Sequence, residues 1–94
     1  MATFVSSGSK FRIWNFTLST DPQQIVLNEE VNTLVIRCRE AIDLYLKPNT
    51  GAGEYFTIPS GTALTLDVHT GNLEPFSLHA ASSTPVAEII GIIE

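Results

Sequence analysis

The sequence lacks the features on which several classes of protein depend. It has a single cysteine, Cys38, so no disulfide can form within the chain and the fold must be held together by packing. No apolar run approaches the roughly 18–20 residues that cross a bilayer as a helix, and the nearest candidate spans only residues 86–93. The N-terminal segment contains no basic region followed by a long apolar run, so it does not resemble a signal peptide. We therefore expect a soluble protein, made and kept in a cytoplasm.

Basic residues are absent from the second half of the chain. Residues 48–94 contain five carboxylates and no Lys or Arg, whereas all the basic residues come earlier: Lys10, Arg12, Arg37, Arg39 and Lys47. Five acidic residues balance these cations in the first half, so the whole net charge of −5 belongs to the second half. A surface built by the second half repels phosphate groups, and we therefore expect neither nucleic acid nor a membrane as a partner.

Charged residues of either sign are also scarce. They make up 16% of the chain, below the usual share of about 25%, whereas apolar residues make up 44%. A surface of this kind favours assembly over life as a lone monomer. The length of 94 residues corresponds to one domain with one modest core.

Apolar and polar side chains alternate with a period of two along most of the chain, which predicts short β-strands and no convincing helix. Within residues 34–39, the side chains of Leu34, Ile36 and Cys38 share one side, and residues 42–47 repeat the pattern. We expect these two strands to pair or to lie side by side. Further strands are expected at residues 11–18, 24–27, 56–58, 64–69, 76–80 and 86–94.

Turn-forming residues separate these strands at intervals of about 8–12 residues, as in Asp21-Pro22, Pro59-Ser60-Gly61 and Ser82 to Pro85. No segment is long enough to serve as a crossover helix between parallel strands. The prediction is therefore an all-β fold, a small β-sandwich or jelly roll of seven to eight short antiparallel strands. We expect an N-terminal arm at residues 1–10 and a single β-sandwich domain at residues 11–94.

The last predicted strand, residues 86–94, is apolar on both sides. One side carries Val86, Ile90 and Ile92, interrupted by Glu88, and the other carries Ala87, Ile89 and Ile93. A strand of this kind is buried on both faces. It is either a central strand covered by the other sheet and the arm, or a subunit interface, and the sequence leaves both open. For the second alternative the candidate interface residues are Phe4, Val5, Ile89 and Ile93.

The sequence offers few residues for catalysis or metal binding. Only two histidines occur, and His69 and His79 with Asp67 are the one trio that could hold a metal, although solvated surface histidines are the favoured interpretation. Cys38 lies on the apolar side of its strand and is expected in the core. Acidic residues are scattered rather than paired across a cleft. We predict no catalytic residue, no metal site and no cofactor.

A group of cations is expected on outward sides of neighbouring strands. Arg37, Arg39 and Lys47 lie near Tyr45 in the predicted sheet, an arrangement that can stack single-stranded bases. Pairing of these cations with carboxylates across strands is the interpretation we favour, and the expected partners are Asp43 and Glu40.

A second group consists of aromatic residues near the start of the chain. Trp14 with Phe11 and Phe16 can line a platform for a sugar. However, Trp14 and Phe16 fall on the same side of their strand, so packing in the core is the simpler interpretation.

Four short segments resemble the small one-domain β-sandwich proteins found in the virions of tailed bacteriophages. They form the order strand, acid-aliphatic-aromatic strand, Pro-Ser-Gly turn and further strand: Asn32 to Arg39, Ala41 to Leu46, Phe56 to Thr62 and Leu64 to Leu66. The resemblance extends over about residues 25–94 and involves only strand and turn residues.

This resemblance implies a capsid decoration or cement protein located in the virion, with no enzymatic activity and no cofactor. Its expected partners are further copies of the same chain, in a trimer, and a viral major capsid protein, with no small-molecule substrate. Two other functions stay open: a tail-fibre or carbohydrate-binding module, and a small metalloenzyme of the cupin type.

Overall fold

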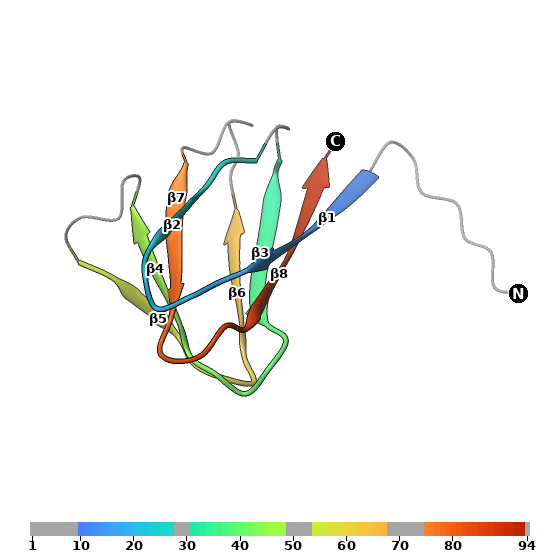
Figure 1. The fold of residues 1–94 in the computed structure, drawn as a ribbon. Helices are drawn as coiled ribbons and strands as arrows, with labels where there is room; N and C mark the ends of the chain where they lie inside the picture. The colour runs from blue at the N-terminus through green and yellow to red at the C-terminus, as the bar shows by residue number, and fades with distance from the viewer. Residues whose placement is uncertain (1–9, 28–30, 49–53, 68–74, 94) are drawn as a thin grey trace, which may run out of the picture.

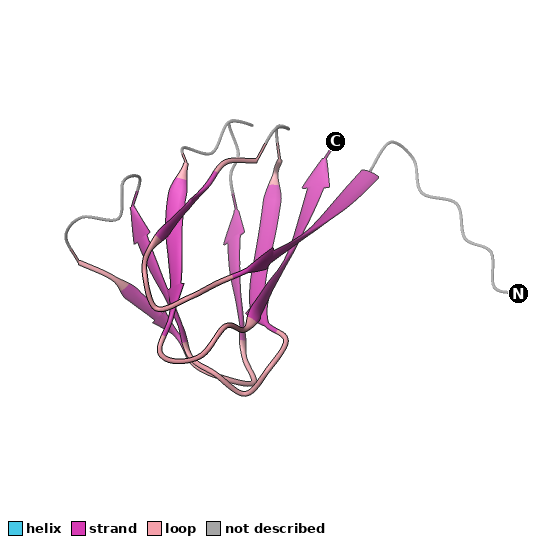
Figure 2. Cartoon of the chain, viewed as in Figure 1, coloured by secondary structure: helices cyan, strands magenta, loops and turns pink. Residues whose placement is uncertain are grey.

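The computed structural model describes residues 10–27, 31–48, 54–67 and 75–93, which form a two-layered β-sandwich (Figure 1). Strands and loops account for these residues, and no helix occurs among them (Figure 2). None of the described segments therefore supplies a helix of the length and apolar character needed to cross a membrane. The predicted all-β class is confirmed.

The described residues form two four-stranded sheets. The strands are β1 (Lys10–Thr17), β2 (Gln23–Ile25), β3 (Thr33–Cys38), β4 (Leu44–Pro48), β5 (Phe56–Ile58), β6 (Ala63–Asp67), β7 (Phe76–Ala80) and β8 (Val86–Ile93). One sheet has the order β1-β8-β3-β6 and the other β2-β7-β4-β5, and every neighbouring pair is antiparallel. This is the arrangement of a jelly roll, so the predicted small sandwich is confirmed.

The chain runs through the sandwich as one long hairpin wound into two layers. Residue 10 pairs with 93, 23 with 78, 33 with 67 and 44 with 58, so the midpoints of these pairs all lie between positions 50 and 52. Each of the strands β1 to β4 therefore has only strands of the second half of the chain as neighbours. Neither sheet is therefore built by the second half alone, and Asp67 and Glu88 of that half share their sheet with strands of the first half.

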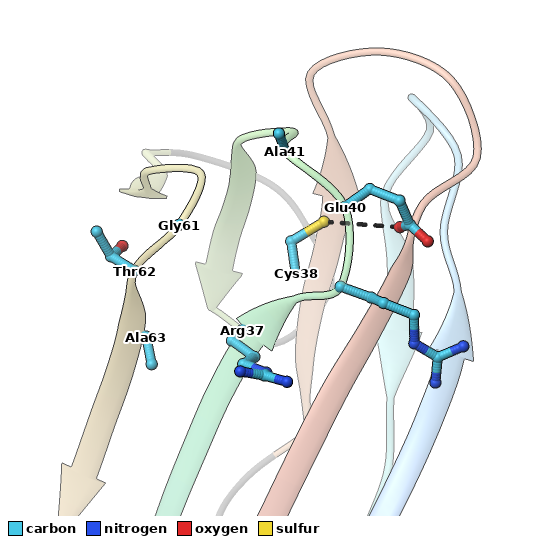
Figure 3. Close-up of a pocket in the computed structure, with 8 residues that line it drawn as sticks. Arg37, Cys38, Glu40, Ala41, Gly61, Thr62 and Ala63 are labelled. Atoms are coloured by element: carbon cyan, nitrogen blue, oxygen red, sulfur yellow. Dashed lines mark hydrogen bonds between the residues drawn. The ribbon is translucent and has the colours of Figure 1, made fainter.

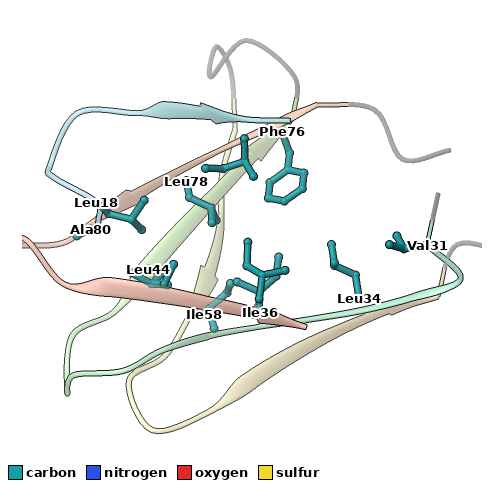
Figure 4. Packing of buried hydrophobic residues seen from close by; sticks show 12 residues of the cluster. Leu18, Val31, Leu34, Ile36, Leu44, Ile58, Phe76, Leu78 and Ala80 are labelled. Atoms are coloured by element: carbon teal, nitrogen blue, oxygen red, sulfur yellow. The ribbon is translucent and has the colours of Figure 1, made fainter. Parts of the chain in front are cut away.

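The core lies between the two sheets (Figure 4). β3 of one sheet contributes Leu34 and Ile36, while the other sheet contributes Leu44 from β4 and Leu78 from β7. All four side chains have an exposed fraction of 0%. The sequence alternation had predicted these side chains on the apolar sides of their strands, and burial confirms it.

The expectation that β3 and β4 pair or lie side by side was wrong. β3 lies between β8 and β6, whereas β4 lies between β7 and β5 in the opposite sheet. The chain passes from one sheet to the other over residues 39–43, where the Ile42 N–H donates to the Glu40 carbonyl at 2.9 Å. Alternation fixes which side chains share a face, but it does not fix which strands are hydrogen-bonded to each other.

The predicted turn after β5 carries the chain back to the first sheet. The Thr62 N–H donates to the Pro59 carbonyl at 3.2 Å, and Gly61 has a φ of 78°. A type II turn requires positive φ at its third residue, which glycine adopts without strain. Phe56 departs from the expected apolar face because it is 58% exposed, on a three-residue strand at the edge of its sheet.

β8 is the central strand between β1 and β3. Its inward side chains include Ile89, which is 1% exposed. Gly91 is also buried, and a Cβ atom there would lie 2.8 Å from Trp14 Cζ3 and 2.8 Å from Val31 Cγ1. Atoms of these types do not approach so closely without movement of the neighbours. Glycine at this position therefore lets Trp14 pack directly against the backbone of β8.

Of the two open interpretations of the last strand, the structure supports the central strand covered by the other sheet. Ile89 belongs to the buried core and Ile93 packs against it, so both predicted interface residues face inward within a single chain. The outward side of β8 carries Ile90 and Ile92 instead. Phe4 and Val5 lie outside the described residues, as does the predicted arm apart from Lys10, the first residue of β1.

Leu44→Ala should lower the free energy of unfolding by about 2–5 kcal/mol, because it removes buried methyl groups and leaves a cavity between the sheets. Urea denaturation followed by circular dichroism measures the effect. Gln23→Ala, at an exposed position on β2, is the control and should change it by less than about 0.5 kcal/mol. Equal effects of the two substitutions would mean that the register of β4 is shifted by one residue.

Candidate functional sites on the two outer sheet faces

The outer face of the β1-β8-β3-β6 sheet carries a contiguous group of apolar side chains, which we call the apolar face. Register places Phe11 opposite Ile92 and Ile13 opposite Ile90, and Ile90 is also opposite Val35 on its other side. Phe11 is 59% exposed, Ile13 61% and Ile92 37%. Contiguous exposed apolar residues on a small protein commonly mark a surface that meets another molecule.

An ion-pair network borders the apolar face. Arg37 Nε lies 2.9 Å from Glu88 Oε1, and Arg39 Nε lies 3.1 Å from Glu88 Oε2. The hydrogen bonds from Arg37 and then Arg39 hold the pKa of the Glu88 carboxyl below its ordinary value of 4.5. With Ile13, Val35 and Ile90, the Arg37 and Glu88 side chains line a shallow hollow of about 200 Å³.

The sequence favoured pairing of the arginines with carboxylates across strands. Asp43 and Glu40 were named as the partners, and this assignment was wrong. Asp43 accepts a hydrogen bond from the Ser60 N–H at 2.8 Å, and Glu40 accepts one from the Val86 N–H at 2.8 Å. Both carboxylates therefore hold loop and strand-end backbone in place. Glu88 faces Arg37 directly in the β3–β8 register, a neighbour relation that the sequence alone does not give.

The three predicted cations do not form one patch. Lys47 lies on β4 in the other sheet, so it is separated from Arg37 and Arg39 by the core. The stacking site for single-stranded bases that the sequence left open is therefore not assembled. The proposed sugar platform is not assembled either, because Trp14 and Phe16 pack against the core while Phe11 is exposed on the opposite side of β1.

A larger hollow, of about 360 Å³, lies where β3 ends and β6 begins (Figure 3). Cys38 and Glu40 both line it, with the Cys38 Sγ 4.0 Å from Glu40 Oε2, a long and weak contact. Cys38 is half-buried and packs against the core, as its position in the alternation predicted. Among the described residues that line the hollow there is no histidine.

The outer face of the other sheet carries three rings, Tyr45, Tyr55 and His79, which we call the aromatic cluster. Tyr45 on β4 lies opposite His79 on β7 in the register, with ring centroids 4.9 Å apart. Tyr55, just before β5, meets Tyr45 edge to face at 4.8 Å and 73°. Sequence reasoning missed this cluster because its members come from three segments, and only the strand order brings them together.

The sequence favoured a solvated surface position for His79. In the structure the side chain is instead half-buried within the aromatic cluster. Its Nδ1 atom is buried and has no hydrogen-bond partner among the described residues. Burial lowers the pKa of His79 below its ordinary value of 6.5, and the positive charge of Lys47 lowers the pKa further. The imidazole is therefore neutral at pH 7.

The trio of His69, His79 and Asp67, which the sequence left open as a less favoured metal site, is not seen together within the part of the chain that the structure describes. His69 lies outside the described residues, and among those described no three His, Cys, Asp or Glu side chains are grouped to hold a metal ion. Asp67 instead accepts a hydrogen bond from the Thr33 hydroxyl at 3.3 Å, which ties β6 to β3.

Comparison of the chain with models of protein families, with curated proteins and with solved structures gave no match. Function is therefore inferred from the two outer faces themselves.

Titration of His79 by NMR should give a pKa below 6.5, and Lys47→Met should raise that pKa only in part, because burial is the larger cause. Below pH 6.5 the unfolded chain takes up the proton before the folded chain does. The free energy of unfolding should therefore fall as the pH drops below 6.5, and above pH 6.5 it should not depend on the titration of His79. A measured pKa at or above 6.5 would contradict the burial of the ring.

Glu88→Gln should weaken the dependence of stability on acid pH. Because the folded-state pKa of Glu88 is depressed, its contribution is present above the ordinary pKa of 4.5 and is lost as the pH falls through the folded value. Urea denaturation between pH 3 and pH 7 follows this loss in the native protein. Gln23→Ala, at an exposed position on β2, is the control, because it removes no titrating group and should leave the profile unchanged.

Proposed function

We propose that this protein is a non-enzymatic structural subunit that associates with copies of itself and attaches to a viral capsid lattice, as a decoration protein of a bacteriophage virion. The observation that carries this proposal is the exposed apolar face of the β1-β8-β3-β6 sheet. The strand and turn segments that resemble small virion proteins are its second support.

The size of the apolar face favours attachment at many sites. Four strands about 4.8 Å apart with a rise of about 3.3 Å per residue give this sheet a flat area of roughly 400–500 Å². A standard specific interface buries about 800 Å² per partner, so one such contact is weak. A subunit that binds a repeating lattice as an oligomer gains about 10²–10⁴-fold in avidity without any further interface. Such weak but repeated contacts match the proposed role.

The charges near the apolar face also favour contact between copies. The net charge of −5 opposes close approach of two chains. The described charges at the outward positions of this sheet nevertheless cancel, because Arg37 and Arg39 balance Glu88 and Asp67. Copies that meet through this face therefore bring together neutral surfaces and keep the excess negative charge elsewhere.

Ile13→Ser tests the proposal, because it removes a largely exposed apolar side chain from the part of the face that β1 forms. The dissociation constant for self-association should rise by about tenfold or more, since burial of such a side chain contributes about 1.5–3 kcal/mol. Sedimentation velocity measures the oligomer, and pelleting with empty capsids of the encoding virus measures attachment.

Val26→Ser is the matched control, since Val26 is 62% exposed and Ile13 61%, but Val26 lies just after β2 and away from the apolar face. It should change neither sedimentation nor pelleting. Wild-type protein that sediments as a monomer and stays in the supernatant with capsids at micromolar concentration would overturn the proposal.

A further inference from the structure

We propose that the outer face of the β2-β7-β4-β5 sheet is a second binding site, in which the aromatic cluster binds an uncharged sugar by stacking against Tyr55. This site lies on the opposite side of the sandwich from the apolar face and does not depend on the function proposed for that face.

The ring of Tyr55 is open to solvent and also contacts neighbouring rings of the cluster. It is 59% exposed, so a ligand can reach it. Its edge-to-face contact with Tyr45 at 4.8 Å limits its rotation, and Tyr45 is itself held on a strand opposite His79. His79 also lies 6.4 Å from Tyr55, at 72° between the ring planes. A ring that is already oriented loses little conformational entropy when a ligand stacks on it.

The charges around the cluster select against ionic ligands. The described side chains at outward positions of this sheet carry one charge and no carboxylate: Gln24, Tyr45, Lys47, Thr57, Ser77 and His79. A cationic ligand would be repelled by Lys47 and would find no carboxylate at the described outward positions of the strands, although Glu54 directly precedes Tyr55 in the chain. A polyanion such as nucleic acid needs several phosphate contacts, and one lysine in a chain of net charge −5 does not supply them.

The composition of the face also distinguishes a sugar from a purely apolar ligand. Hydroxyl groups belong to both tyrosines and to Thr57, which lies opposite Tyr45 in the register, so the face carries neutral donors and acceptors as well as rings. His79 adds a neutral imidazole, because burial of its Nδ1 disfavours the second proton. Sugars present C–H groups on one side of the ring and hydroxyls at the rim, and this pattern matches a stacked ring bordered by neutral hydrogen-bonding groups.

The test uses the full-length protein on an array of neutral oligosaccharides, with sialylated and sulfated glycans as comparison probes. We expect saturable binding to at least one neutral glycan, and Tyr55→Ala should weaken that binding by at least about tenfold, as expected for loss of the main stacking ring. Titration calorimetry with the glycan that binds gives the dissociation constant for each variant.

Phe56→Ala is the matched control. Phe56 is the next residue and is 58% exposed, but its side chain lies on the other side of β5, so its loss should change the affinity by less than about twofold. Both positions are exposed, and circular dichroism verifies that both variants keep the fold. Equal losses from Tyr55→Ala and Phe56→Ala would overturn the proposal.

Two further measurements distinguish stacking on the aromatic cluster from ionic binding and from binding at the apolar face. Binding restricted to sialylated or sulfated glycans and abolished by Lys47→Met, or no saturable binding to any neutral glycan at millimolar concentration, would also overturn the proposal. Ile13→Ser should leave glycan binding unchanged, and Tyr55→Ala should leave sedimentation unchanged. The failure of either proposal is therefore distinguishable from the failure of the other.

Discussion

The antiparallel pairing of each strand in the first half of the chain with strands of the second half is the constraint on which the rest of the structure depends. Among the described strands, β1 has β8 as its one neighbour and β2 has β7, so the first and last strands must meet before the β1-β8-β3-β6 sheet is complete. The core forms between layers that each contain both halves. The apolar face and the aromatic cluster are likewise assembled from segments far apart in the sequence.

This pairing brings charges that are far apart in the sequence close together in the sheet. Arg37 on β3 and Arg39 just after it, both from the first half, hold Glu88 on the adjacent strand β8 of the second half. Charges that are separated along the sequence thus lie opposite each other in the sheet. Opposite charges on neighbouring strands are stabilising, whereas like charges on strands of the same half would repel each other.

The sequence was sufficient to predict the all-β class and the buried side chains, because a period of two determines which residues share a face. Leu34, Leu44 and Leu78 are examples. It was not sufficient to predict strand neighbours, since pairing over long separations leaves no local signal. β3 and β4 were therefore placed together, and the arginines were given the wrong partners. Tyr45 and His79 appeared as isolated residues for the same reason, since only register places them side by side.

The close contact between Trp14 and Gly91 gives the protein an internal optical reporter. The chain contains one tryptophan, and its indole lies at the junction of the first strand with the last. Both tyrosines that the chain contains lie in or beside strands of the opposite sheet. Fluorescence excited selectively from the indole therefore reports whether the two ends of the chain are joined, while tyrosine emission follows the other layer.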